Sequence, residues 1–93
     1  MTKHEKRIQR ARNNPKGVSY NDFISILENE GYIVQQASGS HMKASKRIDE
    51  QTFIMTFARP HRKKKTMHRK AIMRLLEQLD KIAELESDTD ANE

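Results

Sequence analysis

The chain of 93 residues contains no cysteine and no tryptophan, and aromatic residues make up only 5% of it. The lack of cysteine excludes disulfides, thiolate metal sites and a cysteine nucleophile. The scarcity of aromatics means that a core must be built mainly from Ile, Leu, Met and Phe. No apolar run approaches the roughly 20 residues that a membrane-spanning helix needs, and the N-terminus lacks the apolar stretch of a secretion signal. These absences favour a cytoplasmic protein without a membrane partner.

Charge, by contrast, is abundant and unevenly distributed. Charged residues make up 33% of the chain and the net charge is +5. Residues 1–76 hold 17 Lys and Arg against 6 Asp and Glu, a balance of +11, whereas residues 77–93 hold 1 against 7, a balance of −6. A basic body attracts polyanions such as nucleic acids. The acidic end is interpreted either as a solvated tail or as a segment lying over the basic surface.

Two helices are expected in the first third of the chain. Residues 3–13 are basic and have few apolar side chains, so we expect a short helix that ends before Pro15. Residues 19–30 have apolar side chains at helical spacing. Ser19 is a favourable N-cap and Gly31 a favourable left-handed C-cap.

Strand-forming residues then alternate with turn residues. Strands are expected at 32–36, 41–46 and 52–58, with turns at 38–40 and 47–51. A long helix is expected at 66–86, capped by Thr66. The order predicts an α+β fold in which a three-stranded antiparallel sheet has helices packed on one face. We divide the chain into a basic helical extension (1–16), a main domain (17–86) and a disordered acidic tail (87–93).

The last helix carries a long apolar stripe. It consists of Met67, Ala71, Ile72, Leu75, Leu76, Leu79, Ile82 and Ala83. Because about 20 helical residues span ~30 Å, the stripe is longer than one sheet covers. The end near Leu79, Ile82 and Leu85 is therefore a candidate contact for a partner or for a second copy of the chain.

Four short motifs occur in an order that resembles a known family. They are Val18-Ser19-Tyr20-Asn21-Asp22-Phe23, Glu30-Gly31-Tyr32, Gly39-Ser40-His41 and Arg59-Pro60-His61. Together with the order of helices and strands, this series resembles the HicA family of bacterial toxins over roughly residues 4–83. Many members have a second histidine or an aromatic residue just after the histidine of the Gly-Ser-His turn. Here Met42, Lys43 and Ala44 follow instead.

The resemblance implies a fold like that of double-stranded-RNA-binding domains, with the order α-β-β-β-α. It implies the toxin of a type II toxin–antitoxin system, an endoribonuclease that cuts mRNA and inhibits translation. The implied partner is a HicB-type antitoxin, encoded beside the toxin, which blocks the site and often binds operator DNA. The implied catalytic residue is His41.

The residues also suggest how such a reaction would proceed. RNA cleavage needs a base for the 2′-hydroxyl proton, an acid for the leaving 5′-oxygen, and positive charge beside the phosphate. Imidazole exchanges protons near neutral pH, so we hypothesise that His41 transfers the proton. Gly39 and Ser40 would let the backbone approach a phosphate. Lys43, Lys46 or Arg47 would then neutralise its charge. The alternative without a catalytic role is that His41 is a turn residue bonded to a backbone carbonyl.

A second basic segment completes the predicted RNA footprint. It consists of His61, Arg62, Lys63, Lys64, Lys65, Arg69 and Lys70. His61 is interpreted as a second acid or base, a phosphate contact or a solvated loop residue, and the run as a whole is also compatible with a targeting signal or a solvated face. His4 and His68 are interpreted as surface residues. Because no carboxylates have matching spacing, no metal site or other cofactor is expected.

Two other functions compete with the nuclease hypothesis. A non-catalytic RNA-binding module would share the fold and the basic face, but it would not require a histidine at the turn. A small DNA-binding regulator is supported only by charge, since no compact helix-turn-helix is evident.

Overall fold

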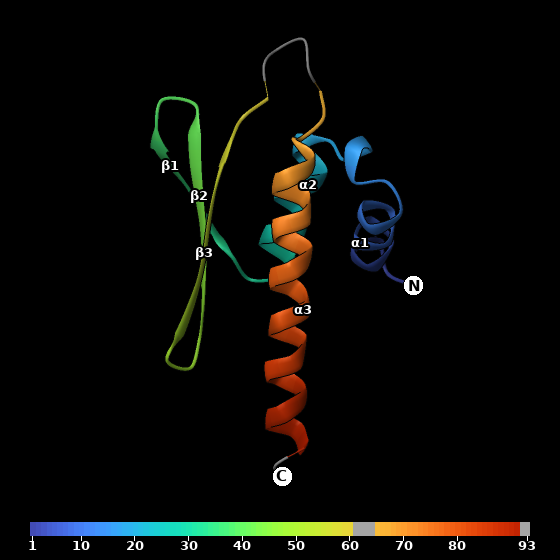
Figure 1. Ribbon diagram of the computed structural model, residues 1–93, viewed down its shortest axis with the longest axis vertical. Coiled ribbons are helices and arrows are strands. Elements are labelled where there is room, and N and C mark those ends of the chain that lie inside the picture. The colour runs from blue at the N-terminus through green and yellow to red at the C-terminus, as the bar shows by residue number, and fades with distance from the viewer. Residues whose placement is uncertain (61–64, 92–93) are drawn as a thin grey trace.

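The helices and strands occur in the order that the sequence predicts. The computed structural model describes residues 1–60 and 65–91. Its elements are α1 (Lys3–Asn13), a 3-10 turn η1 (Pro15–Gly17), α2 (Tyr20–Asn29), β1 (Ile33–Ser38), β2 (His41–Ile48), β3 (Gln51–Ala58) and α3 (Arg69–Ala91). The sheet is antiparallel with strand order β1-β2-β3, and Figure 1 shows the helices on one side of it. The α+β class is therefore confirmed.

Both strand connections are two-residue turns. Residues 39–40 join β1 to β2, and residues 49–50 join β2 to β3. Gly39 and Asp49 have φ angles of 55° and 54°, in the left-handed region that Gly adopts freely and Asp tolerates. The second turn is shorter than the one predicted at 47–51. As a result, β2 and β3 are each longer than expected and pair over their whole lengths.

One face of the sheet forms the floor of the core. Met42 and Ala44 of β2 lie beside Phe57 and Met55 of β3 and are buried under the helices. Phe23 of α2 packs edge-on against Phe57, with ring centroids 4.8 Å apart. The helices add Ala11, Ile26, Leu27, Ile72, Leu75, Leu76, Leu79 and Ile82 to the same cluster. The other face of the sheet carries no helix in the described part of the chain, and we call it the open face.

The two ends of α2 follow the predicted capping signals. The Ser19 side chain accepts a hydrogen bond from the Asp22 backbone N–H at 3.1 Å. At the other end, Gly31 has a φ of 89°, and the backbone N–H of Tyr32 bonds to the Leu27 carbonyl at 2.9 Å. These bonds turn the chain from α2 into β1. They also bury Tyr32, whose hydroxyl donates to Oε1 of Gln78 on α3 at 2.7 Å.

The start of α3 differs from the prediction. Thr66 does not cap the helix, because it forms a bridge with Ser19, and the next backbone N–H, that of Met67, bonds to the Val18 carbonyl at 2.8 Å. His68 takes the capping role instead: its Nδ1 accepts a hydrogen bond from the Lys70 backbone N–H at 3.2 Å. The helix therefore begins at residue 69, after a short extended segment that anchors it to the start of α2.

The end of α3 also differs. The helix continues to Ala91, through most of the segment predicted to be disordered, because extending an anchored helix fixes only one residue for each new hydrogen bond. Leu79 and Ile82 are only 7% and 5% exposed, so these two residues of the predicted partner contact pack within the chain's own core, whereas Leu85, the third, is partly buried. Despite its length, α3 carries too many charges to cross a bilayer, and no other described helix is suited to do so.

α3 also covers the outer edge of the sheet. The guanidinium of Arg74 donates to the Thr56 carbonyl at 3.4 Å, and the Gln78 amide donates to the Ile54 carbonyl at 3.0 Å. Both acceptors belong to β3, an edge strand. One helix face thus satisfies backbone carbonyls that an uncovered edge would leave to solvent or to another chain.

α1 forms a third layer, on the side of α2 and α3 that faces away from the sheet (Figure 1). Ala11 is fully buried and belongs to the common core. Arg12 bonds to Asp80 of α3 at 2.9 Å, and Arg7 lies 3.6 Å from Asp22 of α2. The predicted helical extension therefore packs as part of the main body.

Candidate nucleic-acid interface

The turn before His41 is held in a defined conformation. The Gln36 side-chain amide donates to the Gly39 carbonyl at 2.9 Å. Glycine is favoured at position 39 because the backbone φ is positive. Crowding is not the reason, since a Cβ at this position would meet nothing within 4 Å. Gly39 and Ser40 are both exposed. The turn is thus fixed in shape and open to a ligand.

His41 is the first residue of β2 and lies on the open face. It pairs with Ser38 of β1 and Ala58 of β3, and it is exposed. Its neighbour Met42 points into the core, so strand alternation directs His41 away from the helices. Its side chain makes no hydrogen bond or ion pair with any residue that the structure describes. It is therefore accessible for proton exchange, and no neighbouring group in that set orients its ring.

The three cations predicted to support His41 have different environments. Lys43 is on the same face and about 7 Å along the strand. Arg47 shares that face but lies about 20 Å from His41 along β2, and its Nε donates to the Asp49 carbonyl at 3.1 Å. Lys46 points to the helix side, where its Nζ donates to the Glu30 carbonyl. Only Lys43 is close enough to support chemistry at His41.

The structure adds Arg59 to the cations near the turn, a residue that the sequence analysis did not include in the site. The backbone N–H of Arg59 bonds to the Ser40 carbonyl at 2.9 Å, so the first residue after β3 lies directly beside the turn. Its side chain belongs to an exposed residue. The sequence predicted that the second and third strands pair antiparallel. That pairing places the end of the third strand, and hence Arg59, next to the start of the second strand.

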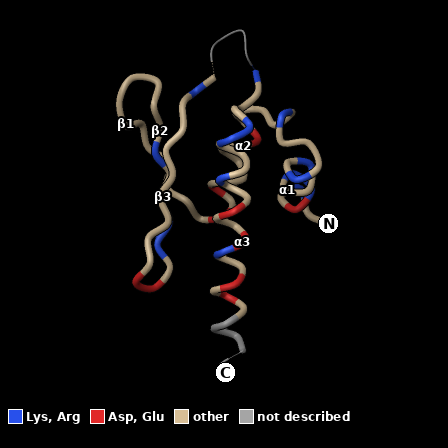
Figure 2. The backbone as a smooth tube through the Cα atoms, in the orientation of Figure 1, with Lys and Arg blue, Asp and Glu red and all other residues tan. Residues whose placement is uncertain are grey.

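The second basic segment begins at the same place. His61, Arg62, Lys63 and Lys64 lie outside the described residues. Lys65, Arg69 and Lys70 are exposed where the chain returns to the body and starts α3. Figure 2 shows Lys and Arg gathered at this end, above a lower part that carries more Asp and Glu. In the first turn of α3 the backbone N–H groups of Lys70, Ala71 and Ile72 already bond to His68, so the attraction for anions at this end comes from the basic side chains.

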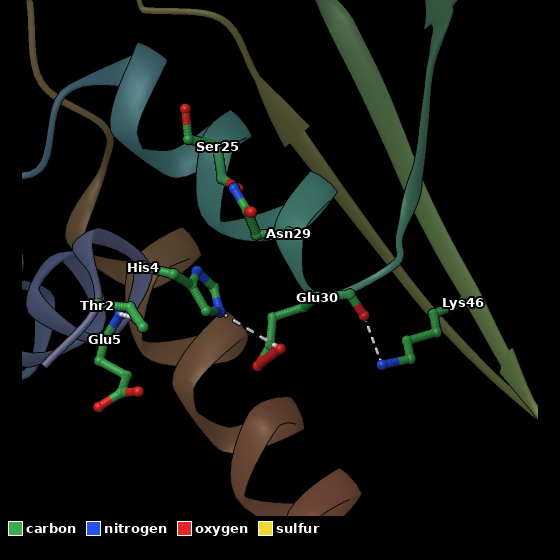
Figure 3. A network of polar contacts seen from close by, with 7 residues as sticks. All are labelled: Thr2, His4, Glu5, Ser25, Asn29, Glu30 and Lys46. Atoms are coloured by element: carbon green, nitrogen blue, oxygen red, sulfur yellow. Dashed lines mark hydrogen bonds and ion pairs between the residues drawn. The ribbon is translucent and has the colours of Figure 1, made fainter.

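His4 is not a surface residue, so that prediction is wrong. It lies half-buried between α1 and α2, with Nε2 3.4 Å from Oε2 of Glu30. Both ring nitrogens are shielded from solvent and have no hydrogen-bond partner. Figure 3 shows His4 approaching the Glu30 side chain while Lys46 bonds to the Glu30 backbone. These two basic residues thus support the end of α2. His68 is exposed as predicted, in addition to its capping role.

The open face as a whole combines cations with exposed apolar side chains. Ile33 is 63% exposed and Ile54 is 49% exposed, on either side of Ser45. His41, Lys43 and Arg47 run along the central strand between threonines and serines, and the described residues of this face include no carboxylate. Among the described residues, no Phe, Tyr or Trp side chain lies on this face, so the large stacking surfaces that single-strand binders use widely are missing here.

Comparison with models of known protein families, with curated proteins and with solved structures gave no match. The likeness to HicA toxins therefore stays a prediction that rests on the ordered motifs.

Proposed function

We propose that this protein is an mRNA-cleaving endoribonuclease of the HicA type, a toxin whose activity inhibits translation. The observation that supports this most directly is the exposed His41 at a well-defined turn, with Lys43 on its strand and Arg59 bonded to the turn's backbone. A purely structural histidine at this position would be expected to have a hydrogen-bond partner. The long basic segment that follows β3 supplies attraction for RNA.

In the proposed reaction, RNA provides its own nucleophile. The 2′-oxygen attacks the adjacent phosphorus, a new 2′-O–P bond forms and the P–O5′ bond breaks. Neutral His41 accepts the 2′-hydroxyl proton, and an acid donates a proton to the leaving 5′-oxygen. Lys43 and Arg59 stabilise the negative charge that builds up on the phosphate oxygens. We assign the acid role to His61, which directly follows Pro60. This sequence of steps needs no metal ion.

The proposed partners follow from the same hypothesis. The RNA-binding residues are those of the turn, Lys43, Arg59 and the basic segment. We remove Lys46 from this set because it is bonded to Glu30, and Arg47 because it lies at the far end of β2, bonded to Asp49. A HicB-type antitoxin would inhibit the protein by covering His41. The open face, with Ile33 and Ile54 exposed on either side of Ser45, offers such a partner an apolar contact on the same face as His41. Both mRNA and antitoxin would be met in the cytoplasm.

One observation favours a second function, that of an RNA-binding module without turnover. Catalytic bases are commonly oriented by a third group, and His41 has no such hydrogen bond within the described residues. On this alternative, the turn and the basic segment hold RNA, and His41 is only one more contact.

Induced expression of the wild type beside His41→Ala separates the two functions. The nuclease proposal expects growth arrest and cleaved mRNA in the wild type, with a loss of about 10²–10⁴ in cleavage rate in the variant. His68→Asn is the matched control, because it removes a histidine and keeps a good capping residue. Cleavage by His41→Ala at the wild-type rate would refute the proposal. RNA binding without cleavage in both proteins would support the binding module.

A further inference from the structure

A pocket of about 200 Å³ lies where α1, η1 and the start of α2 meet, away from the His41 turn. Its polar lining consists of Arg7, Arg10, Asn13, Asn14 and Asp22. The volume is enough for several water molecules or for one phosphate group. The mechanism proposed for His41 gives this pocket no role.

The spacing of these residues directs positive charge and amide groups into one place. Arg7, Arg10 and Asn13 recur every three residues along α1, so they share one helix face. Arginine presents a planar fork of N–H donors that matches the geometry of phosphate oxygens. Asparagine adds neutral donors. This combination is suited to an oxyanion rather than to a cation or an apolar ligand.

The charges in the pocket are not balanced. Arg7 lies 3.6 Å from the single carboxylate, that of Asp22, whose side chain is 43% exposed. Arg10 makes no side-chain hydrogen bond or ion pair with any residue in the described ranges. Two guanidinium groups therefore face one carboxylate, and one positive charge is left without a counter-charge from the described part of the chain.

The pocket adjoins the basic end of the molecule. Val18, which forms part of its wall, accepts the hydrogen bond from Met67, and Ser19 forms the bridge with Thr66. These are the contacts by which the chain returns from the basic segment. Figure 2 shows Lys and Arg continuing from the start of α3 across η1 to α1. A strand bound at the basic segment would therefore meet the pocket next.

We propose that this pocket is a phosphate-binding site that holds a backbone phosphate of the RNA, with Arg10 as its main contact. The inference relies on the proposed function for the identity of the ligand. The phosphate chemistry itself is shared with free inorganic phosphate. The pocket extends the RNA contact onto α1, which lies on the far side of the core from the sheet.

The first test compares Arg10→Gln with Lys81→Gln, both in a His41→Ala background that leaves RNA intact. Lys81 is exposed on α3 outside the pocket, so the control removes the same charge. One phosphate contact on a single strand releases about 0.7 counterion, which at about 0.1 M salt corresponds to about fivefold in affinity. Arg10→Gln should lose that factor, and its salt dependence should become shallower by about 0.7. Equal affinities for the two variants would overturn the proposal.

A second variant tests the opposite direction. Asp22→Asn removes the competing carboxylate, so it should tighten RNA binding and leave Arg7 available. Unchanged or weaker binding in a variant that melts like the wild type would contradict the proposed role of the pocket. Because the Arg10 side chain bonds to no described residue, the Arg10→Gln result does not depend on a loss of folding, and the melting curve provides the same control for Asp22→Asn.

Nuclear magnetic resonance identifies the source of the phosphate. Inorganic phosphate should shift the side-chain amides of Asn13 and Asn14 in the wild type, but not in Arg10→Gln. A short RNA should shift the same signals and compete with phosphate. Phosphate shifts that RNA fails to displace would overturn the RNA assignment. A wild type that binds no RNA at all, while phosphate still fills the pocket, would refute the proposed function rather than the anion site.

Discussion

Tyr32 links the stability of the fold to alkaline pH in a way that can be calculated. Its side chain is only 4% exposed, and burial, with a smaller effect of the Glu30 carboxylate, raises its pKa from 10.0 to about 12. The folded state therefore holds the phenol proton more tightly than the unfolded chain does. The corresponding stability is fully present below pH 10 and is lost as the pH rises towards 12. The linkage relation gives a loss of about 1.4 kcal/mol between pH 8 and pH 11.

Tyr32→Phe removes this titration and provides the measurement. At pH 8 the variant should be less stable by about 0.5–1.5 kcal/mol, because the hydroxyl bond to Gln78 is gone. Urea unfolding of both proteins at pH 8 and pH 11 gives the difference in pH dependence, in which the other titrating groups cancel. The wild type should lose about 1.4 kcal/mol more than the variant over this range. Parallel pH profiles would refute the reasoning.

Three further perturbations test the site and its supports. Lys43→Gln should slow RNA cleavage by about 10- to 150-fold, since contacts of charged groups contribute about 1.5–3 kcal/mol. Arg47→Gln on the same strand should change the rate less than about twofold, and equal losses would contradict the proximity argument. Gly39→Ala should lower the free energy of unfolding by about 1–2 kcal/mol because of its positive φ, and an unchanged urea midpoint would rule this out. His68→Ala should destabilise the protein by about 1 kcal/mol whereas His68→Asn should not, as judged by thermal melting; indistinguishable melts would argue against a capping role.

The parts of this fold that the sequence predicted well depend on local signals. Ser19 and Gly31 act within a few residues of themselves, so the ends of α2 were predicted correctly. The alternation in β3 and the Gly39 turn are equally local. The second hairpin was predicted too loosely because its turn uses Asp49 in a left-handed conformation, which the composition of the segment does not specify.

The errors came from contacts between distant segments. His4 is half-buried because Glu30 lies across from it, 26 positions later in the chain, and Lys46 bonds to the same residue from the sheet. Thr66 was predicted to cap the last helix, but it pairs with Ser19 instead. At the site, the sequence identified the turn and its histidine. Alternation along the strand also placed Lys43 on the face of His41, but the sequence did not indicate that Lys46 bonds to Glu30, 16 positions earlier in the chain.

The cover that α3 places over β3 gives the sheet two unequal borders. Arg74 and Gln78 donate hydrogen bonds to backbone carbonyls of β3. A strand from another chain would have to displace both side chains to pair there. β1 is the other border, and no described side chain from a helix bonds to its backbone. Growth of the sheet by strand addition, whether by a partner or by a misassembled copy, is therefore directed to β1. That border ends at the Gly39 turn, so a strand added there would lie next to the residues that the proposed chemistry needs.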